Sequence, residues 1–325
     1  MAALAAALLA APALIALYLA LAPGNHGASH ARASRSTPAV TGAVPRATAP
    51  MSDPLTPVSP AAFNAPVAAY LTYADHQLGL MESRISQLER ALASGDRSGA
   101  QKAWRGAFAD YLTLGAVYLE GQIEGLNQAI DGTAGGLRAG TASRHFTGLH
   151  RLELGLWTGA ALRSLEPWGR LLAADVSKLR RTLPHVRISP LDYATRAHEI
   201  LEDAVRDLLS GTDVPWSGEG VLGTDAAVIA TSHVVKTLAP LLNTSESVLG
   251  VDSALTALRS TIASIRSEHG GLLPTNSHLT QRQSERLDAS VGMALEGLAQ
   301  IPGALETAIP TRTPPIPRGA LRADP

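Results

Sequence analysis

The chain has 325 residues, a formal net charge of -1 and no cysteine, with 46% hydrophobic and 4% aromatic residues. The lack of cysteine excludes disulfides, thiolate metal ligands and a cysteine nucleophile, so a bound metal would need His, Asp and Glu as ligands. The near-neutral charge, with no run of Lys and Arg, gives no basis for nucleic-acid binding.

The N-terminal segment 1–22 is apolar, uncharged and long enough to span a bilayer. It predicts a signal peptide or a membrane anchor. Because a basic leading region is missing and the cleavage pattern at 31–33 is weak, both readings stay open. Either one places the rest of the chain outside the cytoplasm, where it could be secreted, periplasmic or anchored to the membrane. Residues 23–60 are rich in Pro, Ser and Thr and predict a linker, and 306–325 predict a disordered tail.

The segment 61–305 is expected to be the folded domain, and helical periodicity dominates it. One stripe of apolar residues predicts a long first helix that ends at Gly95, with the spacing 7, 3, 4, 3, 4 over Leu71, Leu78, Met81, Ile85, Leu88 and Leu92. Further helices are expected at 98–119, 146–157, 165–182, 190–210 and 225–242, and a glycine-rich loop at 132–145.

The last third of this domain continues the helical pattern. Leu255, Leu258, Ile262 and Ile265 repeat the spacing 3, 4, 3. Thr280 and Gln283 predict a capping box ahead of a final helix, which Pro302 interrupts. Because no run of alternating apolar residues indicates a strand, the sequence predicts an all-α fold of one or two up-down helical bundles.

The first candidate metal ligands are His150 and Glu153, in the stretch FTGLHRLELGLW at 146–157. Their i, i+3 spacing places both side chains on one helical face, from which they can converge on one ion. Their neighbours are apolar, and burying a carboxylate there without a partner is unfavourable. A metal ion or a basic side chain would remove that penalty. A half-exposed salt bridge between the two is the alternative.

A second pair, His198 and Glu202, has the spacing i, i+4 within RAHEILEDAVRDLL. Two such pairs on antiparallel helices could face one bundle interior, as in carboxylate metal sites, whereas the alternative is a solvated charged face. Because residue 202 is Glu, the zinc-protease motif H-E-x-x-H is not met. Asp131, where a helix meets the glycine-rich loop, is a further candidate ligand or a local cap.

These segments resemble a known family. FTGLHRLELGLW is similar to the G-x-H-x-x-E helix of the imelysin family, also called peptidase M75, and in particular of its EfeO/EfeM-type iron-uptake members. The resemblance continues through LNQAIDGTAGGL and RAHEILEDAVRDLLSG and covers roughly 65–305. It implies a helical bundle and a metal site at His150 and Glu153, with Asp131 at a recurring acidic position. The cargo it implies is ferrous or ferric iron, with zinc or another divalent ion as the alternative.

The chain also departs from this family. Many relatives carry Y-E-x-I-E-P in the second helix, and here Leu112 and Gly115 replace the two glutamates. The loop 216–225 lacks the pattern Y-S-H-T-D-L. The cupredoxin domain of the long family members has no counterpart, so the chain is expected to be the short, EfeM-like form. The departures put the strength of metal binding in question.

The leading hypothesis is a non-catalytic, extracytoplasmic metal-binding protein that presents iron to an iron permease or peroxidase component of an uptake system. The first alternative is an M75-type metal-dependent peptidase, for which Glu199 is the local candidate for the general base. The second is a metal-free module that binds a glycan or peptide through aromatic side chains, namely Tyr70, Tyr73, Trp104, Tyr111 and Tyr118.

Overall fold

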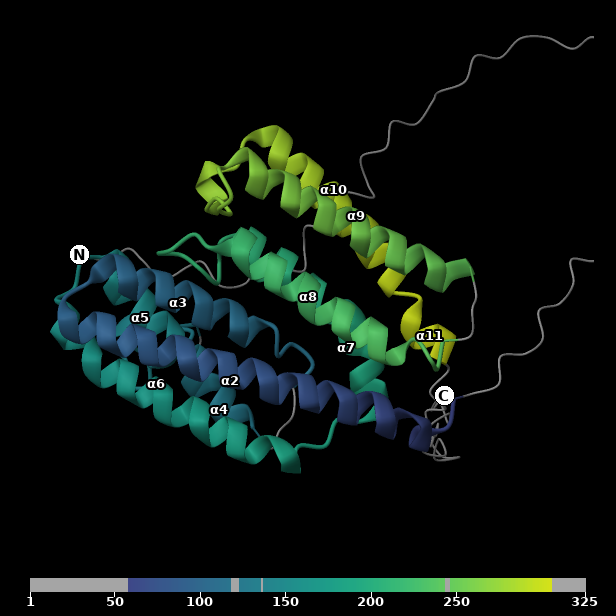
Figure 1. Cartoon of the computed structure of the whole chain (residues 1–325), viewed down its shortest axis with the longest axis horizontal. Coiled ribbons are helices and arrows are strands. Elements are labelled where there is room, and N and C mark those ends of the chain that lie inside the picture. The colour runs from purple at the N-terminus through teal and green to yellow at the C-terminus, as the bar shows by residue number, and fades with distance from the viewer. Residues whose placement is uncertain (1–57, 118–122, 136, 243–245, 306–325) are drawn as a thin grey trace, which may run out of the picture. The chain divides into compact units, whose positions relative to one another are not determined.

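The computed structural model describes residues 58–117, 123–135, 137–242 and 246–305 (Figure 1). The expected segments 1–22 and 306–325, and nearly all of the expected linker, lie outside the described residues. All described residues belong to one compact unit of the chain, Ser52–Pro325. The described regular structure is helical throughout and contains no strand, which confirms the all-α prediction.

The main helices are α2 (Asn64–Ser94), α3 (Arg97–Leu112), α4 (Glu124–Asp131), α5 (Gly148–Trp157), α6 (Leu162–Thr182), α7 (Pro190–Asp203), α8 (Gly220–Leu238), α9 (Glu246–Glu268), α10 (Gln281–Leu298) and α11 (Ile301–Leu305). Short 3-10 turns are η1 (Pro60–Phe63), η2 (Gly140–Ala142), η3 (Leu183–His185) and η5 (Asn276–His278), and η4 (Ala204–Leu209) is a π-helical turn that continues α7.

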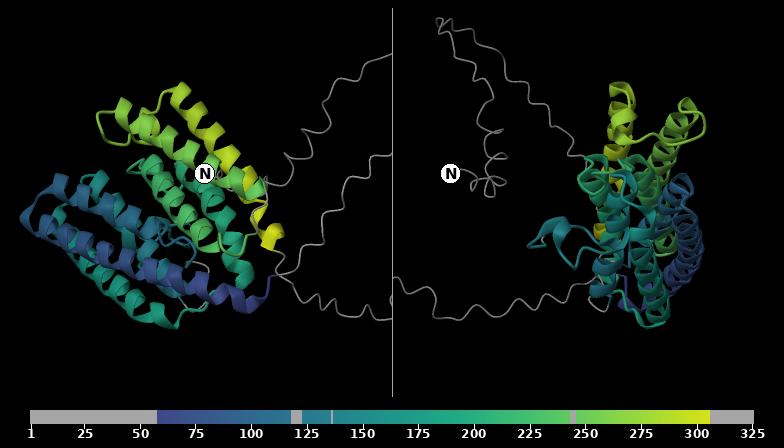
Figure 2. Two further views of the ribbon diagram at one scale, coloured as in Figure 1. Left: turned by 45° about the vertical axis from the view of Figure 1, so that its right-hand side comes forward. Right: turned by 90° about the vertical axis from the view of Figure 1, so that its left-hand side faces the viewer.

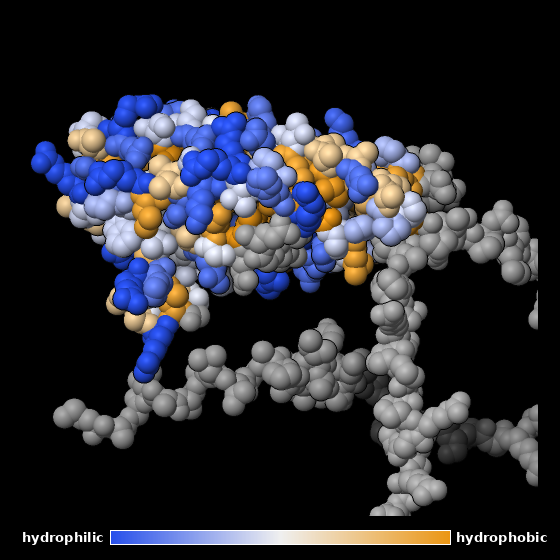
Figure 3. Space-filling model, turned by 90° about the horizontal axis from the view of Figure 1, so that it is seen from below, coloured by the Kyte–Doolittle hydropathy of each residue, from blue (hydrophilic) through white to orange (hydrophobic). Residues whose placement is uncertain are grey.

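Helix α2 packs against α3 and α6 along its length, and α8 lies against α3 and α7 (Figure 1). The α9–α10 hairpin contacts the α7–α8 pair, and the glycine-rich connection after α4 extends away from the helices (Figure 2). In the space-filling view, apolar residues are interspersed with polar ones over the visible face (Figure 3). Within the described part of the chain, no helix has the length and apolarity needed to cross a bilayer.

Helix α2 confirms the periodicity read from the sequence. Leu78, Met81, Ile85, Leu88 and Leu92 are all buried and form one stripe that faces the core, and Leu71 at the start of the predicted stripe is half-buried. The helix ends at Gly95, whose φ of 79° is a left-handed conformation that glycine adopts without steric strain. The predicted capping box at Thr280 and Gln283 is also present at the start of α10.

The helix predicted at 98–119 is shorter than expected, because α3 ends at Leu112 and turns follow as far as Val117. Other elements satisfy the backbone of these turns. The Tyr70 hydroxyl donates to the Thr113 carbonyl at 3.2 Å and accepts from the Ala116 amide at 3.1 Å. Arg196 Nε donates to the Gly115 carbonyl at 3.0 Å. The apolar residues that suggested more helix are therefore buried by a compact turn.

Candidate metal centre

Two glycines allow the end of α4 to meet the start of α5. Gly132 has a φ of 73° and Gly148 a φ of 68°, both left-handed. A Cβ on Gly132 would lie 1.8 Å from the Thr147 carbonyl oxygen, and one on Gly148 would lie 2.2 Å from the Ile130 oxygen. Only glycine fits such an approach of two backbones. The crossing brings Asp131, the last residue of α4, beside the first turn of α5.

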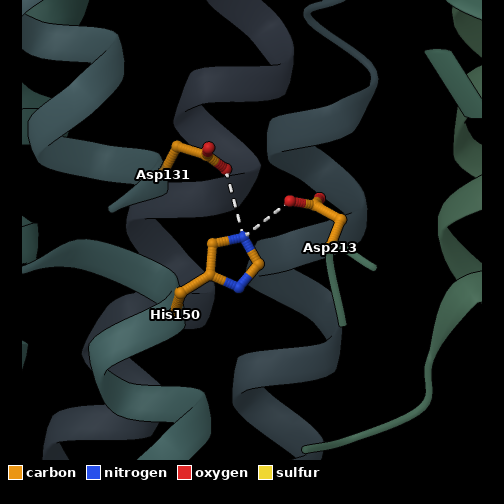
Figure 4. Close-up of side chains that lie close together, drawn as sticks. All are labelled: Asp131, His150 and Asp213. Carbon is orange, nitrogen blue, oxygen red and sulfur yellow. Dashed lines mark ion pairs between the residues drawn. The ribbon is translucent and has the colours of Figure 1, made fainter. Parts of the chain in front are cut away.

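A cluster of three potential metal ligands forms at this crossing (Figure 4). His150 Nε2 lies 3.4 Å from Asp131 Oδ1 and 3.4 Å from Asp213 Oδ1. Asp213 comes from the loop between η4 and α8, so three separate segments supply the three side chains. One ligand atom from each residue lies within 4.8 Å of the other two.

These distances fit a shared ion. Nitrogen and oxygen donors lie about 2.1 Å from a zinc-like ion, and two such donors at a tetrahedral angle are about 3.4 Å apart. His150 is 1% exposed. Its Nε2 is buried and has no hydrogen-bond partner among the described residues. Since a buried polar atom that makes no hydrogen bond is unfavourable, an ion bound between Nε2 and the two nearby carboxylates would remove that penalty.

Glu153 contacts Nδ1, the other ring nitrogen of His150. Its Oε2 lies 2.8 Å from His150 Nδ1, and its Oε1 accepts from the Ser217 amide at 2.8 Å and the Ser217 hydroxyl at 2.7 Å. A carboxylate on Nδ1 assigns the proton of the neutral imidazole to that nitrogen and leaves the Nε2 lone pair for an ion. Glu153 therefore orients His150 and also anchors the loop that carries Asp213.

The electrostatics of the cluster favour a positive charge. Burial lowers the pKa of His150, but the nearby carboxylates of Asp131, Asp213 and Glu153 raise it by more, so the pKa lies well above its ordinary value. The metal-free cluster therefore holds a proton, and a metal ion would have to displace it.

The second predicted pair lies elsewhere. On α7, His198 Nδ1 is 3.3 Å from Glu202 Oε2, and the two side chains are 27% and 56% exposed. The structure brings Asp131 and His150 together with Asp213, and in the described part of the chain His198 and Glu202 are not in that group. Their role as ligands stays a prediction on which the site described above does not depend.

Asp213 is the member of the cluster that sequence reasoning missed. It lies in GTDVPWSGEG, a loop in which no helical spacing connects it with His150. The loop returns to α5 because the amides of Trp216 and Ser217 donate to Glu153. It is held from the other side by Asn276, whose backbone N–H donates to the Gly218 carbonyl at 2.9 Å. An acidic residue two positions after a glycine, in a loop, was the only signal in the sequence.

No protein-family model matches the chain. The iron uptake system component EfeO of Yersinia pseudotuberculosis is 23% identical over 242 residues, which cover 74% of this chain and 64% of that protein. EfeM of Pseudomonas syringae is 20% identical over 242 residues, 74% of this chain and 84% of that protein. EfeO of Escherichia coli is 23% identical over 182 residues, 55% of this chain and 48% of that protein.

The chain thus spans less than two thirds of the length of the EfeO proteins that it matches. The similarity is low in identity but extends over most of the folded domain, including the helix that carries His150 and Glu153. It agrees with the family resemblance found in the sequence. The chain is a distant homologue of the EfeO and EfeM iron uptake components, with an imelysin-like, all-helical domain.

Proposed function

We propose that this protein binds an iron ion through Asp131, His150 and Asp213 and serves as an extracytoplasmic component of an iron-uptake system. The observation that carries the proposal is the buried Nε2 of His150, which faces two carboxylate oxygens, each at 3.4 Å. In this role the protein would receive the ion outside the cytoplasm and pass it to a membrane permease or peroxidase partner.

The donor set limits the choice of metal. One imidazole nitrogen and two carboxylates, without thiolate, suit iron, zinc or manganese. The names of the relatives, iron uptake system components, favour iron as the cargo and support partners from such a system. Zinc is the alternative cargo, because the same donors hold it at similar distances.

Two observations favour binding over the other hypotheses. Glu199, the general base expected for a peptidase, accepts a hydrogen bond from Arg196 at 3.2 Å and is not grouped with the cluster. Tyr70 and Trp104 are fully buried and fill the core, so they do not line a groove for a glycan or peptide. Tyr118 lies outside the described residues.

Calorimetric titration of the purified chain with ferrous ion under argon, ferric ion and zinc would test the proposal. We expect one ion per chain. His150→Ala and Asp213→Asn should each weaken binding by about 100-fold, at or above the loss seen when a supporting residue of a metal site is removed. The double variant His198→Ala/Glu202→Ala is the matched control and should bind as the wild type does. Equal affinities of the His150→Ala variant and the wild type would refute the proposal.

A further inference from the structure

The candidate metal centre forms part of the wall of a pocket of about 960 Å³. This volume is far larger than a single ion needs. Besides Asp131 and Asp213, the charged residues among the described lining are Asp175, Asp203, Asp207, Arg144, Arg196 and Arg206. The pocket therefore combines the cluster of acidic ligands with several guanidinium groups.

The described protein ligands do not complete the coordination of an iron ion. The cluster offers three donor residues, fewer than the four donor atoms of a tetrahedral ion and the six of an octahedral one. Leu112 and Gly115 also line the pocket and carry no donor group in their side chains. At Gly115 a Cβ would lie 2.8 Å from the side chain of Ile200, so α7 fills that space. Asp131 and Asp213 both line the pocket, so an ion held between them would be open to a further ligand from that side.

Arg196 indicates which kind of ligand would occupy the remaining coordination positions of the ion. It is 3% exposed, its Nε donates to Gly115 at 3.0 Å, and its Nη1 donates to Glu199 and to Asp203. Its Nη2 has no acceptor within the described part of the chain. A largely buried guanidinium with an unused Nη2 group, in the lining of a pocket, is a strong donor for an anionic oxygen.

The charges of the pocket make anion binding depend on the ion. The described lining has five aspartates and three arginines, and this excess of negative charge repels an anion from the metal-free pocket. A divalent ion neutralises the excess and a trivalent ion reverses it. The ion and an anion are thus expected to bind together, and neither should bind as well alone.

We propose that a small oxygen-donor anion of the carbonate or carboxylate class binds in this pocket together with the metal ion. Its oxygens would coordinate the ion from the pocket, and it would accept a hydrogen bond from Arg196. This inference rests on the proposed function, since it requires an ion at Asp131, His150 and Asp213. According to this inference, the protein carries the metal ion together with the bound anion.

Retention of labelled anion tests the inference. The full chain, loaded with ferric ion, is dialysed against ¹⁴C-labelled bicarbonate, oxalate or citrate in separate arms, in parallel with metal-free protein. We expect about one anion per bound ion from at least one arm, and none without metal. Which arm retains label distinguishes carbonate from carboxylate sources. In buffer freed of all three anions, the affinity for the ion should fall by about tenfold or more, as on losing one charge-assisted hydrogen bond.

Variants then test the role of Arg196. Arg196→Gln should lose the retained label and the dependence of ion affinity on the anion, while it still binds the ion. Because Arg196 is buried, Arg144→Gln at the same pocket is a second variant, expected to weaken retention of the anion in part. Arg138→Gln, in the same loop as Arg144 but outside the lining, is the matched control and should behave as wild type.

Four results would overturn the inference. Loaded protein that retains no label in any arm would show that water completes the coordination. Equal retention by metal-free protein would show an anion site independent of the ion. A protein that binds no ion in any buffer would overturn both the inference and the proposed function, whereas ion binding that is indifferent to anions would overturn the inference alone.

Discussion

Two histidine–carboxylate pairs in this protein look alike in the sequence and differ in the fold. On α5, His150 and Glu153 are 1% and 0% exposed, whereas on α7 the side chains of His198 and Glu202 are 27% and 56% exposed. Helical spacing places each pair on one face of its helix. The difference comes from other segments. Asp131 and Asp213 reach His150, and the 211–219 loop covers Glu153, while His198 and Glu202 are paired with each other.

The largest expected contrast is in stability. Glu153→Ala should lower the free energy of unfolding by about 3–5 kcal/mol, because it leaves buried donors on His150 and Ser217 without an acceptor. Glu202→Ala, at the exposed pair, should change it by at most about 0.5 kcal/mol. Urea unfolding followed by circular dichroism measures both. Similar midpoints for the two variants would mean that burial does not distinguish the pairs.

Addition and removal of metal should also distinguish the two histidine–carboxylate pairs, with a smaller effect on stability. An ion present at about 100 times its dissociation constant should stabilise the native state by about 2.7 kcal/mol. A chelator should reverse this gain. The gain should persist in the His198→Ala variant and vanish in the His150→Ala variant. Thermal unfolding with and without metal checks the prediction, and a gain retained by His150→Ala would place the bound ion elsewhere.

The crossing of α4 and α5 can be tested with a pair of glycines. Gly148→Ala should lower stability by about 2 kcal/mol, because a residue with a Cβ is strained at a φ of 68° and its Cβ would collide with the Ile130 oxygen. It should also weaken metal binding, since Asp131 and His150 would move apart. Gly159 has a similar φ of 83°, but a Cβ at that position would lie in open space, so Gly159→Ala is the matched control. It should cost about 1 kcal/mol and leave metal affinity unchanged, as unfolding and titration would show.

Asp110 on α3 has a half-buried carboxylate that does not belong to the metal-ligand cluster, so it shows the effect of burial alone. Its Oδ2 is buried with no hydrogen-bond partner among the described residues, and Arg84 Nε lies 3.9 Å away. Burial raises the pKa of Asp110 to about 6, against the opposing influence of Arg84 and His76. Because the folded pKa exceeds that of the unfolded chain, the protein loses stability as pH rises from about 4 through about 6.

Asp110→Asn should remove this dependence and stabilise the protein at pH 7 by about 1 kcal/mol, a value reduced for the partial exposure of the carboxylate. Unfolding curves of both proteins between pH 4 and pH 7 measure the effect. A variant less stable than wild type at pH 7 would show that the Asp110 carboxylate has a stabilising partner.

Local sequence determined the helices and two of the three members of the cluster. The apolar stripe of α2, its end at Gly95 and the capping box at Thr280 depend on residues within a few positions of each other, so periodicity and capping rules predict them. The same holds for the placement of His150 and Glu153 on one face of α5. Asp131 was identified as a candidate because it follows a helix and precedes a glycine.

Tertiary structure decided the rest, because it depends on where distant segments meet. Asp213 reaches His150 only through the return of the 211–219 loop to Glu153. Glu153 lies on Nδ1 because the Ser217 amide fixes its carboxylate. Helix α3 stops at Leu112 because Tyr70 and Arg196 satisfy the turns that follow. Spacing along a helix determines which side chains share a face, and the packing of other elements against that face determines whether it becomes a metal centre.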